Sequence, residues 1–232
     1  MIMPRTTHRN AATVTHTDEY VLVDMGTPRP CLSNAAFGGG LVQARYIVNR
    51  TVPKGWSPTD PVQEMNAYLR DRGLDTSACV GLLTAVHVKS TVHHAEVRDG
   101  WSVEAFVTTG VRNAARAGGG TPIAHPVPGT INIILLVHGA LPPAAMIDAV
   151  QVAVEAKCAA LSDGDIRTAR GEIATGTTTD TVTVACLGDE PTSLYAGTAT
   201  SVGYAIGHVV HAAVTAGLGP ARTRIETERN PG

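Results

Sequence analysis

A nearly continuous apolar run at residues 130–137 constrains the fold of this chain more than any other feature. The run reads Thr-Ile-Asn-Ile-Ile-Leu-Leu-Val. A strand with one solvated face alternates apolar and polar side chains, whereas a strand buried on both faces reads as a continuous apolar run. We therefore predict a central strand with protein packed against both faces of its sheet.

Asn132 interrupts this run and needs a hydrogen-bond partner. Burying its amide without one would cost about 1–3 kcal/mol. The partner is either a neighbouring backbone group or an amide of a substrate. Asn132 is therefore a candidate substrate-binding residue.

Weaker strand and helix patterns surround the central run. Strand patterns lie at residues 20–23, 45–49, 80–88, 91–97, 101–107 and 179–186. Arg98-Asp99-Gly100 is a hairpin signal between two of them. Helical periodicity predicts helices near residues 62–72, 143–161 and 202–214. The expected buried stripe of the second helix is Ile147, Val150, Val154 and Leu161.

No fixed-period repeat and no Pro/Ser-rich linker divides the chain. The prediction is a single α+β domain over residues 19–218, with a mostly antiparallel sheet covered by the three helices. Residues 1–18 and 219–232 are polar and lack a clear period, so we expect both ends to be flexible.

Composition narrows the classes of partner. Apolar residues make up 44 % of the chain and aromatic residues 4 %, which favours a core of closely packed small side chains. The net charge of −2 comes with no basic stripe of the kind that a nucleic-acid binder needs. The longest unbroken apolar run, residues 133–137, is too short to cross a bilayer, and the first residues do not resemble a signal peptide.

These features favour a cytoplasmic protein that acts on a small molecule, without a nucleic-acid or membrane partner. Gly203 and Gly207 in the last predicted helix allow close helix packing, either within the chain or in a homodimer.

Common catalytic and metal-binding motifs do not occur in the sequence. It holds no GxxxxGK[ST], GxGxxG, HExxH or GxSxG pattern. The four cysteines are scattered, which favours free thiols over a zinc ribbon or a disulfide framework. His93 and His94 point to opposite faces of a strand, and the helical pair His208 and His211 has no nearby carboxylate. We therefore predict no metal site.

Two segments are unusually rich in glycine or polar residues. Ser33, Asn34 and Gly39 belong to the first, where backbone N–H groups could approach a ligand. The alternative is a flexible connection. Arg112 and Asn113 belong to the second, directly after a strand, where functional residues are frequent. The alternative there is a turn with a solvated arginine.

A threonine-rich segment at residues 174–184 contains the strongest candidate for a catalytic carboxylate. Asp180 follows Thr177, Thr178 and Thr179 and shares a strand face with Val182. A carboxylate at the rim of an apolar face, among hydroxyls, suits a general base or a group that holds an amide. An exposed threonine-rich edge, with Asp180 as a turn former, explains the same pattern.

Taken in order, these segments resemble the adenosylcobinamide amidohydrolase family. The similar stretches are residues 32–34, 38–40, 44–49, 81–85, 108–114, 129–133, 144–146, 149, 155–157, 174–180 and 184. The family hydrolyses the amide between aminopropanol and the corrin ring of adenosylcobinamide, giving adenosylcobyric acid for cobamide synthesis. The resemblance implies a corrinoid substrate, cobalt included, and no separate cofactor. The family often has Gly or Ala where this chain has Thr178, which could narrow the site.

For this reaction we expect Asp180, Thr177 and Glu155 to carry the chemistry. Asp180 would be the general base, and backbone N–H groups near residues 38–40 or Gly176 would hold the oxyanion. We expect water as the nucleophile rather than a threonine, because neither Thr177 nor Thr178 has an α-amine to activate it. Glu155 would be a second carboxylate if its helix face lines the site. The expected substrate-binding residues are Ser33, Asn34, Gly39, Arg112, Asn113, Asn132 and Thr178.

Two other functions fit the same polar segments. A corrinoid-binding or carrier protein without hydrolytic activity would use the same cleft and release its ligand intact. An interaction module would use these segments only as turns and would bind no corrinoid.

Overall fold

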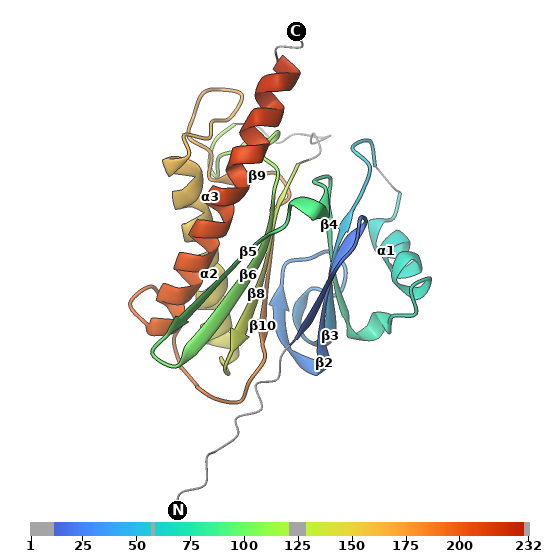
Figure 1. Ribbon diagram of the computed structural model, residues 1–232, viewed down its shortest axis with the longest axis vertical. Coiled ribbons are helices and arrows are strands. Elements are labelled where there is room, and N and C mark those ends of the chain that lie inside the picture. Colours follow the sequence, from blue (N-terminus) through green and yellow to red (C-terminus); the bar gives the residue numbers. More distant parts are fainter. Residues whose placement is uncertain (1–11, 57–58, 121–128, 230–232) are drawn as a thin grey trace, which may run out of the picture.

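The apolar run forms strand β8 (Ile131–His138), which lies between β10 (Thr181–Cys186) and β6 (Trp101–Thr109). Every residue of β8 except His138 is buried, so the prediction of a strand covered on both faces is confirmed. This computed structural model describes residues 12–56, 59–120 and 129–229. Figure 1 shows the sheet around β8 with helices packed against it.

The remaining strands complete an eight-stranded sheet and a separate two-stranded ladder. Their bounds are β1 (Thr13–His16), β2 (Tyr20–Ser33), β3 (Gly40–Thr51), β4 (Cys79–Thr84), β5 (Val92–Arg98), β7 (Ala114–Ala115) and β9 (Gly176–Thr177). The strand order is β4-β3-β2-β10-β8-β6-β5, with β1 paired to β2, while β7 pairs with β9. Among the paired strands in the described residues, only the β3–β4 and β10–β8 pairs are parallel. The predicted α+β class with a mostly antiparallel sheet is confirmed.

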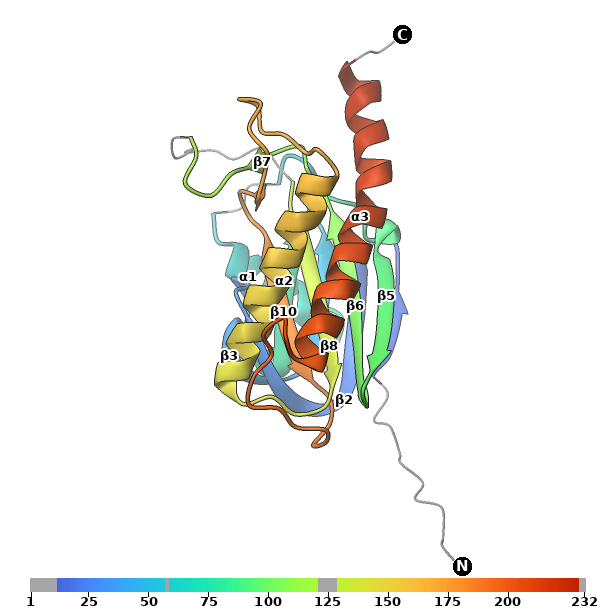
Figure 2. The ribbon, with the colours of Figure 1, turned by 90° about the vertical axis from the view of Figure 1, so that its left-hand side faces the viewer.

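In the described part of the chain, three α-helices cover the sheet. They are α1 (Pro61–Arg70), α2 (Pro143–Asp163) and α3 (Ser201–Arg229). Two short 3₁₀ helices, Thr76–Ala78 and Val88–Ser90, lie before and after β4. Figures 1 and 2 show α2 and α3 side by side over the β10-β8-β6 part of the sheet, with α1 near β3 and β4. Met65 and Leu69 are the buried residues of α1, and both belong to a small hydrophobic core.

The sheet curls around a second core on the face away from α2 and α3. This core joins Val23 and Ile47 from one half of the sheet to Phe106, Ile134 and Leu136 from the other half. Both faces of β8 are therefore packed by protein, as its sequence requires.

The buried face of α2 differs from the predicted stripe. Ile147 is 60 % exposed and Val154 is 37 % exposed, so the prediction is wrong for these two residues. The buried residues of α2 are Ala145, Met146, Ala149, Val152, Ala153, Lys157, Ala160 and Leu161. Small alanines let α2 approach the sheet closely, but they add little amplitude to a hydrophobic periodicity, which explains the error.

The two ends of the chain contain more regular structure than predicted. Strand β1 lies within the segment expected to be flexible, and α3 continues to Arg229, well past the predicted end near residue 214. The sequence after Leu218 has no apolar stripe, so periodicity could not indicate this continuation. Residues 1–11 and 230–232 of the expected flexible ends lie outside the described residues.

Helix α3 contains a stretch, Ser201–Gly219, that is long and apolar enough to cross a membrane by length and composition alone. Half of this stretch is buried inside the protein. Its buried residues, including Ala205, Ile206 and Val209, belong to the core shared with β8 and α2. Gly203 also packs within the chain, since a Cβ there would lie 2.0 Å from the carbonyl oxygen of Gly197.

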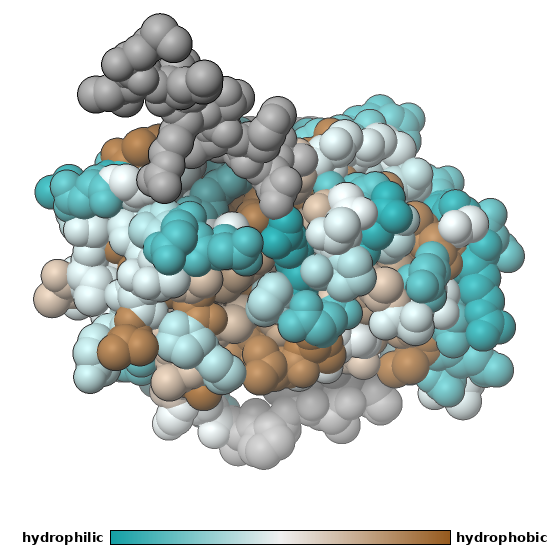
Figure 3. Space-filling model, turned by 90° about the horizontal axis from the view of Figure 1, so that it is seen from below, coloured by the Kyte–Doolittle hydropathy of each residue, from teal (hydrophilic) through white to brown (hydrophobic). Residues whose placement is uncertain are grey.

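The lower end of the molecule in Figure 1 is viewed directly in Figure 3, where hydrophobic (brown) residues alternate with hydrophilic (teal) ones. The first turns of α2 and the segment between β10 and α3 lie at this end (Figures 1 and 2). Exposed apolar residues of these parts are Ile147, Leu194 and Tyr195.

A carboxylate between two histidines should make stability depend on acid pH. His138 Nε2 lies 2.8 Å from Glu104 Oε1, and His93 Nε2 lies 2.9 Å from Glu104 Oε2. The hydrogen bond with His138, aided by the one with His93 and opposed by burial, lowers the pKa of Glu104. A carboxyl group with a lowered pKa stabilises the fold above its unfolded pKa of about 4.3, and this contribution is lost as the pH falls through the folded pKa.

We expect Glu104→Gln to be less stable than wild type at neutral pH and to lose less stability between neutral and acid pH. Urea unfolding across this range measures both effects. Asp189→Asn, at an exposed position, is the matched control and should follow the wild-type curve. Parallel curves for wild type and Glu104→Gln would contradict the role of Glu104.

Candidate functional site

A pocket of about 790 Å³ lies where the chain enters β10. Its walls come from the second half of α2, the threonine-rich turn before β10 and the segment after β2. The lining residues are Asn34, Ala36, Ala115, Arg116, Ala117, Val154, Lys157, Cys158, Thr175, Gly176, Thr177, Thr178, Thr179, Asp180 and Thr181. This volume is within the usual range for small-molecule sites.

The turn before β10 is built around the carboxylate of Asp180. The backbone N–H of Thr177 donates to Asp180 Oδ2 at 3.0 Å, and the Thr177 hydroxyl donates to Asp180 Oδ1. The parallel register of β10 and β8 pairs Thr181 with Asn132, which brings Asp180 to the start of β8. There the N–H of Ile131 donates to Asp180 Oδ1 at 3.0 Å.

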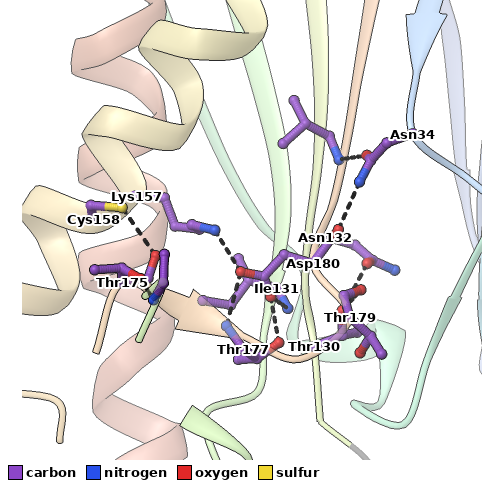
Figure 4. Close-up of polar contacts among 12 residues, drawn as sticks. Asn34, Thr130, Ile131, Asn132, Lys157, Cys158, Thr175, Thr177, Thr179 and Asp180 are labelled. Carbon is purple, nitrogen blue, oxygen red and sulfur yellow. Dashed lines mark hydrogen bonds and ion pairs between the residues drawn. The ribbon is translucent and has the colours of Figure 1, made fainter. Parts of the chain in front are cut away.

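Lys157 provides the fourth donor to this carboxylate (Figure 4). Its Nζ lies 2.5 Å from Asp180 Oδ2, and the two side chains are 7 % and 11 % exposed. Lys157 reaches this position because it belongs to the buried face of α2. A carboxylate offers about four lone-pair positions. The four donors therefore occupy all of them.

Gly176 leaves the space that this ion pair needs. A Cβ at Gly176 would lie 2.5 Å from Asp180 Oδ2 and 2.8 Å from Lys157 Nζ. Strand β9 also pairs Gly176 with Ala115 of β7, which fixes the backbone at this point. Position 176 therefore requires glycine, because the side chains of Asp180 and Lys157 lie too close to the backbone for a Cβ.

Two asparagines hold the backbone around the pocket. Asn34 Nδ2 donates to the carbonyl of Asp180 at 2.9 Å, and its Oδ1 accepts from Val182 N at 2.7 Å (Figure 4). Asn113 Nδ2 donates to the carbonyl of Gly129 at 2.7 Å and to Thr178 Oγ1 at 2.6 Å. Both side chains stabilise the threonine-rich turn.

Asn132 finds its partners inside the protein. Its Nδ2 donates to Asn49 Oδ1 at 2.9 Å and to the carbonyl of Leu83 at 3.0 Å, and its Oδ1 accepts from Thr130 Oγ1 at 3.2 Å. The Asn132 side chain is fully buried. A backbone carbonyl and two side chains satisfy its amide, so a substrate is not needed for this purpose.

The structure brings Asp180, Thr177, Thr178 and Asn34 together in the pocket wall. Ser33 and Gly39 are not among the lining residues. Ser33 Oγ is 2.7 Å from Thr183 Oγ1, and a Cβ on Gly39 would lie 2.1 Å from the carbonyl oxygen of Ala35.

The remaining candidates, Arg112, Asn113 and Glu155, are not among the lining residues. Arg112 is exposed, and Asn113 reaches the pocket only through Thr178. Glu155 is exposed and accepts a hydrogen bond from Gln151 at 3.1 Å. The glycines at 38–40 are likewise absent from the lining.

Sequence reasoning missed Lys157 as a site residue, together with Arg116 and Cys158. The signal for Lys157 was its spacing from Ala149 and Ala153, which places it on the buried face of α2. Cys158 Sγ lies 3.0 Å from the carbonyl of Thr175. Burial, opposed by Lys157, raises the pKa of the Cys158 thiol, so it is a weak nucleophile at neutral pH.

Within residues 12–56, 59–120 and 129–229, no three His, Cys, Asp or Glu side chains form a group that could hold a metal ion. His208 and His211 face different carboxylates: His208 Nε2 lies 3.9 Å from Glu96 and His211 Nε2 lies 2.8 Å from Asp163.

We expect Gly176→Ala to disrupt the ion pair and lower the free energy of unfolding by about 1–3 kcal/mol, because the added methyl group would overpack the site. Gly197→Ala is the control, since a Cβ at Gly197 meets nothing within 4 Å. Its free energy of unfolding should stay within about 0.5 kcal/mol of wild type. Urea unfolding of both variants measures the difference, and equal stabilities would contradict the crowding at Gly176.

Comparison with known proteins identifies relatives over almost the whole chain. Residues 3–225 match the family described as "Adenosylcobinamide amidohydrolase". A Methanosarcina mazei protein with that name is 32 % identical over 194 residues, covering 80 % of this chain and 88 % of the relative. A Halobacterium salinarum protein with the same name is 32 % identical over 204 residues, covering 85 % and 84 %. Among solved structures, the PH0078 protein of Pyrococcus horikoshii is 8 % identical, with a TM-score of 0.46 over 90 % of this chain and 82 % of that chain.

Proposed function

This chain belongs to the adenosylcobinamide amidohydrolase family, and we propose that it hydrolyses the amide between aminopropanol and the corrin side chain of adenosylcobinamide. The products would be aminopropanol and adenosylcobyric acid, which re-enters cobamide synthesis in a salvage reaction. The corrinoid, with its cobalt, is the substrate, and we propose no further cofactor.

The observation that carries this proposal is the buried Lys157–Asp180 pair with the Thr177 hydroxyl in the wall of the pocket. Taking a lysine and a carboxylate out of water has a large desolvation penalty, and an apolar pair of similar volume is often at least as stable. A charged pair at the wall of a pocket is therefore better explained by chemistry than by stability. Amide hydrolysis needs a base and a proton donor, which these groups supply.

The pocket suits the side chain of a corrinoid better than the whole molecule. A corrin ring with its adenosyl ligand is larger than a space of about 790 Å³. The ring would remain outside the pocket and could contact Val154, Ala36 and Ala117, which are exposed apolar residues of the lining. The arm that carries the aminopropanol amide would enter, with Thr178 and the backbone of the threonine-rich turn as hydrogen-bonding groups.

The four cysteines are free thiols, which fits a reducing cytoplasm as the location of the protein.

Incubation with adenosylcobinamide should release aminopropanol and adenosylcobyric acid, separated by chromatography. Asp180→Asn keeps the size of the side chain but removes its basicity, so kcat should fall on the order of 10²–10⁴. Thermal unfolding would show that the variant is folded. Binding without product over a range of pH and added metals would instead support the corrinoid carrier, and normal turnover by Asp180→Asn would remove Asp180 from the mechanism.

Glu155→Gln tests the other carboxylate considered for catalysis. Because Glu155 is exposed and outside the pocket lining, we expect turnover near the wild-type value and a stability change within about 0.5 kcal/mol. The same chromatographic assay measures it. A large loss of kcat in this variant would place Glu155 at the reacting amide after all.

A further inference from the structure

We propose that Thr177 is the covalent nucleophile and that Lys157 delivers a proton to the departing amine. This inference rests on the proposed amide hydrolysis and specifies how it occurs. It also replaces the expectation of direct attack by water, which rested on the absence of an α-amine that could activate Thr177 or Thr178.

The first argument is that the carboxylate of Asp180 has no room for a water molecule. Its oxygens accept from Ile131 N, Thr177 N, Thr177 Oγ1 and Lys157 Nζ. These four donors fill the lone-pair positions of a carboxylate. A water molecule would have to displace one of them before it could pass its proton to Asp180, whereas the Thr177 hydroxyl already points its proton at Oδ1.

The second argument concerns the hydrogen bonds of Lys157. Its ammonium has three N–H donors. Among the contacts found in the described part of the chain, Asp180 is its partner and uses one donor. Lys157 also lines the pocket, so the other donors can reach a bound amide. Lysine and aspartate together thus provide what an α-amine provides elsewhere: a base that activates a threonine and then an acid for the leaving group.

The proposed acylation step conserves atoms and protons. Thr177 Oγ bonds to the carbonyl carbon of the substrate amide, and its proton moves to Asp180 Oδ1. The C–N bond then breaks as Lys157 Nζ donates a proton to the nitrogen, which leaves as aminopropanol. Asp180 returns its proton to Lys157. The corrinoid acyl group is now an ester of Thr177.

Acylation also frees a hydrogen-bonding position on Asp180 for a water molecule. The esterified Thr177 no longer donates to Asp180 Oδ1, so one lone pair becomes available to a water molecule. This water attacks the ester carbon while its proton passes to Asp180. The C–O bond breaks, Asp180 reprotonates Thr177 Oγ, and the carboxylic acid product leaves and loses its proton to solvent.

Thr177→Val tests the nucleophile, because it removes the hydroxyl and keeps the side-chain shape. We expect amide turnover to fall at least on the order of 10³, as when the nucleophile of a catalytic unit is removed, and Thr177→Ser to retain activity. Thr215→Val, on the exposed side of α3, is the matched control and should turn over normally. Circular dichroism and thermal unfolding would establish that each variant is folded.

The ester itself is the more direct readout. Acid-quenched wild type with adenosylcobinamide should carry the corrinoid acyl mass on the peptide that contains Thr177. Hydroxylamine added during turnover should divert part of the product to the corrinoid hydroxamate. An active wild type with neither adduct nor hydroxamate, or a Thr177→Val variant within tenfold of wild type, would overturn the covalent mechanism.

Lysine variants separate proton transfer from simple charge pairing. Lys157→Arg keeps a positive charge beside Asp180, but a guanidinium does not release a proton in proteins. We expect it to fold and bind the corrinoid while losing amide turnover on the order of 10²–10⁴. A corrinoid aryl ester has a leaving group that needs no proton, so its hydrolysis by Lys157→Arg should fall less than tenfold. Lys89→Arg, in the exposed pair with Asp18, is the control.

Equal losses of amide and ester turnover in Lys157→Arg would show that Lys157 is a positioning residue, and full amide turnover would exclude it as the acid.

Failure of the proposed function would give a different result. A small β-lactone, which acylates activated hydroxyls, should label wild type at Thr177 but leave Thr177→Val unlabelled. Labelling at Thr177 without release of aminopropanol would support the nucleophile and reject the substrate. Release of aminopropanol without labelling or adduct would do the reverse.

Discussion

The ion pair between Lys157 and Asp180 is the interaction on which the organisation of this protein depends. It joins α2 to the turn before β10, and the same carboxylate accepts the first N–H of β8. Moving both charges from water into the interior costs desolvation free energy. Their mutual attraction alone does not always offset this cost. The two backbone N–H groups and the Thr177 hydroxyl supply the additional hydrogen bonds that make the buried carboxylate tolerable.

This interaction imposes requirements on distant parts of the chain. Lys157 reaches Asp180 only if α2 lies close to the sheet, and the alanines of its buried face allow this approach. Gly176 must lack a Cβ because the pair occupies that space. The Asn34 side chain extends the β2–β10 pairing at the entry of β10 by bonding both the carbonyl of Asp180 and the N–H of Val182. The small residues of α2 and the glycine at position 176 are therefore requirements of the site.

The sequence could predict features that local chemistry determines. The apolar run predicted β8, and Arg98-Asp99-Gly100 predicted the hairpin in which Asp99 and Gly100 adopt positive φ. The face of α2 could not be predicted in this way, because alanines give a weak periodic signal. Lys157 was missed for a related reason. A lysine in a helix is normally solvated, and its partner lies 23 residues away along the chain.

The candidate site shows the same division between local pattern and tertiary arrangement. Asp180 and Thr177 were recognisable because they lie in one short polar turn. Ser33 and Asn34 are adjacent in sequence, yet Ser33 bonds Thr183 in the interior whereas Asn34 lines the pocket. Sequence alone could not show which of the two faces a ligand without the register of β2 and β10.

The number of hydrogen-bond donors around Asp180 could not be predicted from the sequence either, because they come from three separate parts of the fold: β8, α2 and the turn before β10. In the mechanism that we propose, that number decides which nucleophile Asp180 can activate. A carboxylate with a vacant lone pair would activate water directly, whereas one with every position filled can act only through the groups already bound to it.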